Sequence, residues 1–123
     1  MRLRKERGIL SRVLFVCSGN LDRSPTAERL FQNRMGRWEA KSAGTMLSLA
    51  RNPLTQELVD WADLVLVMEP VHAEFIQAHL NCNPSKVRVL NIADIYVRDN
   101  PRLIHELETK VPPLLRAFVS KNS

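Results

Sequence analysis

The chain has 123 residues, of which 45% are hydrophobic and 25% are charged, and its formal net charge is +5. This length predicts a single domain with enough apolar residues for a core. No apolar run approaches the ~18 residues of a membrane span and no secretory pattern is present, so we expect a cytoplasmic protein without a membrane partner. The two cysteines are too few for a disulfide framework. No His and Cys cluster has metal-ligand spacing, so we expect neither a metal nor another cofactor.

The amino-terminal segment holds most of the excess positive charge. Five basic residues and one acidic residue give the first twelve positions a net charge of +4, so the rest of the chain carries only +1. We expect residues 1–11 to form a basic, disordered tail and residues 12–123 to form the domain. A nucleic-acid or acidic-lipid contact is the alternative for the tail. Because no aromatic residues interleave with its charges to stack on bases, we expect no nucleic-acid partner.

A buried strand and a helix, joined by a turn, follow the tail. Residues 13–16 form a continuous apolar run, which indicates a buried strand. Ser24 can cap a helix and Pro25 suits its first position, and apolar residues then recur at helical spacing until Gly36. The turn at residues 17–23 is therefore placed at a helix amino terminus, where backbone N–H groups and the helix dipole favour an anion.

A thiol and a guanidinium occur together in this turn, and the pair favours thiolate attack on a phosphoryl group. An ordinary thiol has a pKa of about 8.5, which a helix amino terminus and a nearby arginine can lower by roughly 3 units. The planar fork of Arg23 can hold two phosphate oxygens. Gly19 permits a close backbone approach and Asn20 tolerates the left-handed region. The turn predicts a phosphate-binding loop with Cys17 as the nucleophile.

Residues 16–28 resemble the signature of the low molecular weight protein tyrosine phosphatases, Val-Cys-x-Gly-Asn-x-Cys-Arg-Ser-Pro-x-Ala-Glu. Further matches at residues 42–45 and 62–68 extend the resemblance over roughly residues 12–115, and compact bacterial members look closer to this chain. The resemblance implies that Cys17 is the nucleophile, that Asn20 braces the loop and that Ser24 supports the thiolate. It also implies a phosphate site built from Ser18, Gly19, Asn20, Leu21, Asp22, Arg23 and Ser24.

Asp22 is the main departure from the family pattern, because a second loop cysteine, a redox partner of the nucleophile, is usual there. An ionised carboxylate at this position would oppose both the thiolate and an incoming dianion. We expect the Asp22 side chain to turn outward or to pair with a cation such as Arg23. The chain is also shorter than familiar members after the strand that ends at Met68, so part of their substrate-pocket wall is expected to be missing.

The rest of the chain alternates between strands and helices. Strands are expected at 38–42, 62–68 and 87–89, and helices at 54–61, with Asn52 as a possible cap, at 70–80 and at about 101–110. Pro112 and Pro113 are expected to break the last helix before a short piece at 114–119. The order predicts an α/β three-layer sandwich with a four-stranded parallel sheet flanked by helices. Ligands bind beyond the carboxyl ends of such strands, where Cys17 is expected.

A carboxylic acid should protonate the leaving group from another loop. The family keeps an Asp-Pro-Tyr after its fourth strand, and Asp94, Ile95 and Tyr96 occupy that place here. The resemblance implies that Asp94 is the general acid, and later the base that activates water, and that Tyr96 forms an aromatic wall of the substrate pocket. Asp99 is the rival acid, although it can equally cap the following helix.

The three histidines and two tryptophans are expected to have structural roles. His72, His79 and His105 do not share metal-ligand spacing, and a thiolate formed by the loop needs no histidine base, so we expect surface or internally satisfied side chains. Trp38 and Trp61 are expected to pack.

Together these observations predict a monomeric phosphomonoester hydrolase, a protein tyrosine phosphatase acting on phosphotyrosine proteins or small aryl phosphates through a cysteinyl-phosphate. One alternative is a thioredoxin-coupled arsenate reductase, which needs a resolving cysteine pair where this chain offers only Cys82. A weakly active phosphate-binding or phosphopeptide-binding protein is the other alternative, because of Asp22.

Overall fold

The computed structural model describes residues 11–121, so the predicted basic tail lies outside the described residues except for Ser11. Ser11 is buried and opens the first strand, one residue before the predicted start of the domain. In chain order the elements are β1 (Ser11–Cys17), α1 (Arg23–Phe31), η2 (Arg34–Gly36), β2 (Trp38–Gly44), α2 (Gln56–Trp61), β3 (Leu64–Val67), α3 (Pro70–His79), η3 (Pro84–Lys86), β4 (Val87–Val89) and α4 (Pro101–Lys121).

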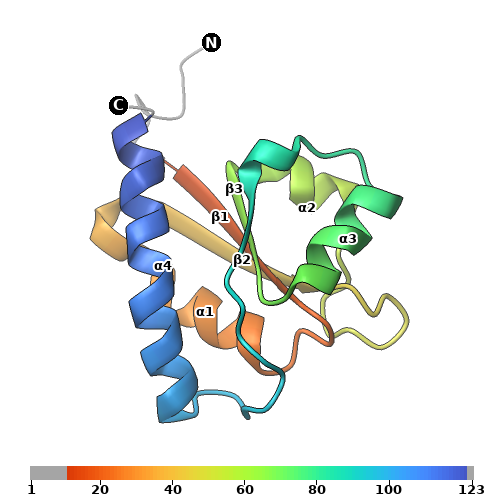
Figure 1. The fold of residues 1–123 in the computed structure, drawn as a ribbon, viewed down its shortest axis with the longest axis horizontal. Coiled ribbons are helices and arrows are strands. Elements are labelled where there is room, and N and C mark those ends of the chain that lie inside the picture. Colours follow the sequence, from red (N-terminus) through yellow and green to blue (C-terminus); the bar gives the residue numbers. More distant parts are fainter. Residues whose placement is uncertain (1–10, 122–123) are drawn as a thin grey trace.

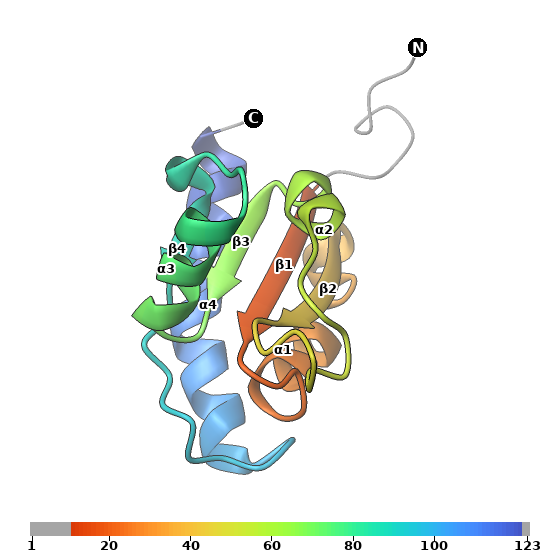
Figure 2. The same ribbon diagram turned by 90° about the vertical axis from the view of Figure 1, so that its right-hand side faces the viewer.

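The four strands form one parallel sheet in the order β2-β1-β3-β4, with β1 and β3 as the two inner strands. Helices α1 and α4 cover one face of the sheet, and α2 and α3 cover the other (Figures 1 and 2). The predicted three-layer α/β sandwich is therefore confirmed.

Each face of the sheet carries its own apolar core. Side chains alternate along a strand, so Val13 and Phe15 of β1 pack toward α1 and α4, and Leu14 and Val16 pack toward α2 and α3. All four are fully buried, which is why this strand is a continuous apolar run. Trp38 belongs to the first core, as expected for a packing residue.

Two predicted helix starts differ from the structure. Helix α1 begins at Arg23, so Ser24 lies inside the first turn and does not cap the helix. The Ser24 hydroxyl instead accepts a hydrogen bond from Asn20 Nδ2. Helix α2 is capped by Thr55, whose Oγ1 accepts a hydrogen bond from Leu58 N at 3.1 Å. The possible cap Asn52 instead donates from Nδ2 to Ser42 O at 2.7 Å and ties its loop to β2.

Helix α1 also ends earlier than the apolar spacing predicts. It ends at Phe31, and Asn33 and Met35 then adopt left-handed conformations, with φ of 62° and 58°. The continuation to Gly36 is consequently an irregular turn that includes η2. Two successive reversals of this kind bring the chain quickly back to the start of β2.

The predicted break at Pro112 and Pro113 is wrong, because α4 runs without interruption from Pro101 to Lys121. An interior proline costs a helix about 3 kcal/mol. However, a fully buried stripe of Leu103, Leu107, Val111 and Leu115 runs along α4 and continues past the prolines, and each such side chain contributes roughly 1.5–3 kcal/mol on burial. On the carboxyl side of the prolines, Phe118 packs on Trp38 with ring centroids 5.6 Å apart. This packing holds the helix together across the prolines.

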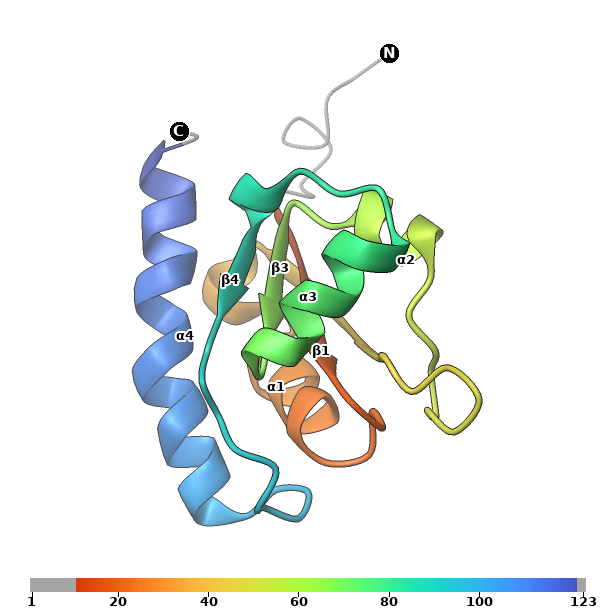
Figure 3. The same ribbon diagram turned by 45° about the vertical axis from the view of Figure 1, so that its right-hand side comes forward.

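The loops after all four strands gather at the carboxyl edge of the sheet, the lower edge in Figures 1 and 3. Main-chain bonds join them: Thr45 N donates to Cys17 O at 3.0 Å, and Ile92 N donates to Met68 O at 2.8 Å. Residues from four separate segments thus meet beside Cys17.

Candidate active site

Cys17 is the last residue of β1, and its thiol lies at the floor of the loop formed by residues 17–24, which we name the phosphate loop. The sulfur is only 3.0 Å from Ser24 Oγ and accepts a hydrogen bond from Asn20 N at 3.2 Å. Asn20 Nδ2 donates to Ser24 Oγ at 2.8 Å, so the acceptors for the serine hydroxyl proton are the Cys17 sulfur at 3.0 Å and Ala43 O at 3.5 Å. Asn20 N and the Ser24 hydroxyl are thus the two donor groups beside the Cys17 sulfur.

The shape of the phosphate loop depends on two backbone positions. Asn20 adopts the left-handed conformation with φ of 54°, which turns its N–H inward, and its side chain is buried. At Gly44, the end of β2, an added Cβ would lie 2.5 Å from Ser18 O and 3.0 Å from Asn20 N. Only glycine allows the loop to lie this close to β2.

Arg23 is buried in the first turn of α1 and is held from two other segments. Its Nη1 donates to Glu69 Oε1 at 2.5 Å and to Ile92 O at 2.8 Å. Its Nε lies 3.7 Å from Asp94 Oδ1. The guanidinium is thus fixed through one nitrogen, which leaves Nη2 and the Nε side of the fork for an anion.

Glu69 is a site residue that the sequence reasoning missed. It lies two residues after the end of β3 and directly before the first residue of α3. Its carboxylate balances the buried charge of Arg23 and orients the guanidinium. The available signal was its position right after a predicted strand, at the edge where ligands bind.

His72 is buried beneath the phosphate loop, a location that the sequence did not predict. Its Nδ1 accepts a hydrogen bond from Glu69 N at 3.0 Å, so the neutral ring carries its proton on Nε2, which donates to Ser18 Oγ at 2.9 Å. Burial, with the Arg23 charge adding to it, lowers the pKa of His72 to about 4. The side chain is satisfied, as expected, and it also ties α3 to the phosphate loop.

Asp94 lies in the loop formed by residues 90–100, which we name the acid loop. Its carboxylate is at the mouth of the site, 65% exposed, and 3.7 Å from the Arg23 guanidinium. Of the two candidate acids, this is the one that the fold brings to the arginine of the phosphate loop.

Asp99 instead faces the outer side of α1. Its Oδ1 accepts from Arg29 Nε at 3.0 Å and Nη2 at 2.7 Å, and its N–H donates to Thr26 Oγ1 at 3.0 Å. These contacts attach the end of the acid loop to α1 and give Asp99 a structural task.

Asp22 uses its carboxylate to hold the acid loop as well. Its Oδ1 accepts a hydrogen bond from Arg98 N at 2.8 Å. The side chain therefore turns to the acid loop, in keeping with the outward orientation that we expected. Its partner is a main-chain amide and not the Arg23 guanidinium.

Tyr96, the expected aromatic wall, is directed toward α4. Its hydroxyl donates to Glu106 Oε2 at 2.7 Å, and this bond to a carboxylate raises the pKa of Tyr96. Its ring packs against the core between the sheet, α1 and α4. The more exposed apolar side chains of the acid loop are Ile95 and Val97.

The second cysteine is remote from the first. Cys82 follows α3 and precedes β4, at the amino edge of the sheet, and packs on the opposite face from Cys17. Within residues 11–121, no group of three or more His, Cys, Asp or Glu side chains could hold a metal ion. None of the helices in this range has the length and apolar character needed to cross a membrane.

Comparison with known proteins identifies the family of this chain. A sequence model described as low molecular weight phosphotyrosine protein phosphatase matches residues 12–53. The Protein-arginine-phosphatase of Bacillus subtilis (strain 168) is 34% identical to this chain in a match that covers 63% of this chain and 69% of that protein. The chain belongs to the low molecular weight phosphotyrosine protein phosphatase family.

Solved structures of the family share the fold. The low molecular weight protein tyrosine phosphatase from T. tengcongensis has a TM-score of 0.68 and 25% identity, over 90% of this chain and 99% of that chain. The YwlE arginine phosphatase from Geobacillus stearothermophilus has a TM-score of 0.66 and 27% identity, over 90% of this chain and 94% of that chain. These relatives are phosphatases, as we predicted for this chain, and they do not favour the arsenate reductase alternative.

Proposed function

We propose that this phosphatase hydrolyses phosphotyrosine through a cysteinyl-phosphate on Cys17. The observation that carries the proposal is the thiol geometry: the sulfur faces two hydrogen-bond donors, Asn20 N and Ser24 Oγ, at the amino end of α1. Donors to a sulfur favour the thiolate, which is the nucleophilic form. The fixed Arg23 fork supplies the second half of a phosphoryl site.

In the first step, the Cys17 thiolate attacks phosphorus and the bond to the phenolic oxygen breaks. Loop amides and Arg23 bind the equatorial oxygens, on which the transition-state charge develops. Asp94, protonated beforehand, gives its proton to the departing oxygen. Its exposed position beside Arg23 supports this role, because a leaving group would depart toward solvent.

In the second step, the Asp94 carboxylate accepts a proton from water as the water oxygen attacks phosphorus. The sulfur–phosphorus bond breaks, phosphate leaves and the thiolate is regenerated. One carboxyl group serves first as acid and then as base, so the cycle closes without a metal or another cofactor.

Apolar side chains around the site support an aromatic leaving group. Large hydrophobic residues that are strongly exposed occur in the phosphate loop, in the loop after β2 and in the acid loop: Leu21, Met46, Leu47, Leu49, Ile95 and Val97. A phenol ring can pack on such side chains while its phosphate reaches Cys17. Tyr96, whose ring packs against the core and whose hydroxyl bonds to Glu106, is the proposed aromatic part of this wall.

Protein arginine phosphatase is the second candidate, because a protein of that name is 34% identical to this chain. Phosphoarginine would place a cationic guanidine at the rim, where Leu21 is apolar and 57% exposed. A side-by-side comparison of matched phosphotyrosine and phosphoarginine peptides decides between the two. We expect a higher kcat/KM for the phosphotyrosine peptide.

The mechanism is tested by Cys17→Ser, with Cys82→Ser as the matched control. Cys17→Ser should fold and bind phosphate but lose hydrolysis of an aryl phosphate, since a serine hydroxyl does not ionise near neutral pH. Cys82→Ser should keep full turnover and should trap labelled phosphate on Cys17 during turnover. If Cys17→Ser retains more than a few per cent of kcat, the covalent mechanism is wrong.

Within this proposal the enzyme acts as a monomer in the cytoplasm on phosphotyrosine proteins or small aryl phosphates. A catalytic thiol suits a reducing compartment. Sedimentation of the purified full-length chain at several concentrations measures the oligomeric state.

A further inference from the structure

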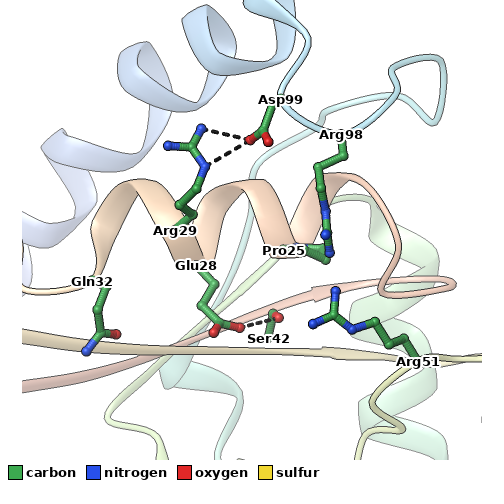
Figure 4. A pocket seen from close by; sticks show the side chains of 8 residues that line it. All are labelled: Pro25, Glu28, Arg29, Gln32, Ser42, Arg51, Arg98 and Asp99. Atoms are coloured by element: carbon green, nitrogen blue, oxygen red, sulfur yellow. Dashed lines mark hydrogen bonds and ion pairs between the residues drawn. The ribbon is translucent and has the colours of Figure 1, made fainter.

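A pocket of about 440 Å³ lies on the outer side of α1, between that helix, the loop after β2 and the acid loop. Two arginines from different loops border it, Arg51 and Arg98, and both side chains are exposed. Figure 4 shows their guanidinium groups converging on the space beside Pro25. Pro25 directly follows the phosphate loop, so this pocket adjoins the proposed catalytic site.

The other charges of the pocket are already engaged. Arg29 forms its ion pair with Asp99, and Glu28 Oε1 accepts a hydrogen bond from Ser42 Oγ at 2.5 Å (Figure 4). By contrast, neither guanidinium of the converging pair has a hydrogen-bond or ion-pair partner among residues 11–121. Two unpaired cations that face one space favour an anionic ligand.

The backbones of both arginines are anchored to the phosphate loop. Arg51 N donates to Gly19 O at 3.1 Å, and Arg98 N donates to Asp22 Oδ1 at 2.8 Å. The same loop that would hold the phosphoryl group therefore holds the backbone of both arginines, and their long side chains extend from these two points into the pocket.

We propose that Arg51 and Arg98 bind an acidic side chain of the protein substrate, close in sequence to its phosphorylated residue. The inference rests on the proposed phosphotyrosine hydrolysis and specifies which phosphoproteins are preferred. An extended chain advances about 3.3 Å per residue, so neighbours one to three positions away reach about 3–10 Å from the phosphorylated residue. That range suits two loops that are each hydrogen-bonded to the phosphate loop.

The test measures peptide affinity in Cys17→Ser, which needs no turnover. Fluorescent peptides carry one phosphotyrosine and either Glu or Gln at a single position from −3 to +3. We expect Glu to bind about fivefold more tightly than Gln at one or two of these positions, an effect that weakens as salt is raised. Adding Arg51→Gln and Arg98→Gln should bring this ratio close to one.

The matched control adds Arg37→Gln and Arg116→Gln to Cys17→Ser. These two arginines border a different pocket, toward the carboxyl end of α4, so the control removes the same charge far from the phosphate loop. It should keep the fivefold ratio. Equal affinities for the Glu and Gln peptides at every position, or a ratio that survives the Arg51 and Arg98 substitutions, would overturn the inference.

Failure of the proposed function would look different. Wild-type protein that does not hydrolyse an aryl phosphate contradicts the phosphatase mechanism, whereas the affinity ratio is read in a variant that is not expected to turn over.

Discussion

The phosphate loop and the acid loop meet at the same edge of the sheet, but they are held in different ways. In the phosphate loop, the side chains of Cys17, Asn20, Arg23 and Ser24 are all buried, and each has a partner within the loop or on the segments that follow β3 and β4. The acid loop is mostly exposed and contains no helix or strand. Asp99 attaches it to α1 through Arg29 and Thr26, and Arg98 N attaches it to Asp22 in the turn that precedes α1.

This difference matches the two tasks in the proposed mechanism. Stabilising charge in a transition state requires donors that are already oriented, so the groups that would bind the phosphoryl oxygens gain from being locked. The proposed acid must let a protein side chain enter and leave, which favours an exposed loop. Substitutions at four positions test this contrast.

Arg23→Lys tests the buried phosphate loop and should have the largest effect. Lysine keeps the charge but has a single nitrogen, so it cannot bond to Glu69 and Ile92 as Arg23 Nη1 does and also present a two-pronged fork to the phosphoryl group. We expect kcat for an aryl phosphate to fall about 10³-fold. Arg34→Lys, at a surface pair with Glu108, is the control and should be nearly silent. A loss below tenfold at position 23 would mean that the fork does not hold the phosphoryl group.

Asp94→Asn tests the exposed acid loop. An alkyl phosphate has a poor leaving group and depends on protonation, so its hydrolysis should slow about 10²-fold, while an activated nitrophenyl phosphate should slow much less. The basic limb of the pH–rate profile should flatten, because asparagine has no proton to lose. Asp99→Asn, which alters only the pairing with Arg29, serves as the comparison. If it shows the leaving-group pattern and Asp94→Asn does not, the wrong acid has been assigned.

Asp22 links the two loops and should have a smaller effect. Asp22→Ala removes the acceptor for Arg98 N, and one hydrogen bond is worth about 1 kcal/mol, so we expect a roughly fivefold loss with the alkyl phosphate. Asp22→Asn keeps an acceptor oxygen and should stay near wild type.

Comparison of Asp22→Asn with the wild type also measures the effect of the Asp22 charge on the nucleophile. The pH dependence of Cys17 alkylation should shift by less than about one unit in Asp22→Asn, because the carboxylate is directed to the acid loop. A drop of two units or more in the thiol pKa, with tighter phosphate binding, would show that Asp22 restrains the site.

His72→Gln should have the smallest effect, on the pH dependence of stability. The pKa of His72 is lowered to about 4 in the folded protein, chiefly by burial, and its ordinary value is 6.5. Between these values the unfolded chain binds the additional proton, so wild-type stability is complete above pH 6.5 and is lost as pH falls toward 4. We expect the Tm of His72→Gln to depend less on pH across this window. A parallel dependence in both proteins would rule out His72 as its source.

Local chemistry made the phosphate loop and the sheet predictable. The strand at residues 13–16 is apolar throughout because both of its faces are covered. The apolar run alone therefore predicts a buried strand, without knowledge of what packs on it. Asn20 and Gly44 stand where a left-handed turn and a close approach require them, and both lie in segments that resemble the family pattern.

Long-range contacts were not predictable in the same way. The partners of Arg23 are 46 and 69 residues away, at Glu69 and Ile92, and no spacing rule connects them. His72 looked like any surface histidine because its burial depends on where α3 is placed against the phosphate loop. The uninterrupted α4 was missed for a related reason. The local sequence shows two helix-breaking prolines, whereas the burial that stabilises the helix across them is apparent only in the folded structure.

Helix α4 has a consequence for how the chain folds. Its two interior prolines leave two carbonyl groups of the preceding turn without helical donors, so the segment alone would be a poor helix. Its buried stripe needs α1 and the sheet to be in place before it has anything to cover. The carboxyl-terminal helix is thus a product of the assembled sheet and cannot act as its nucleus.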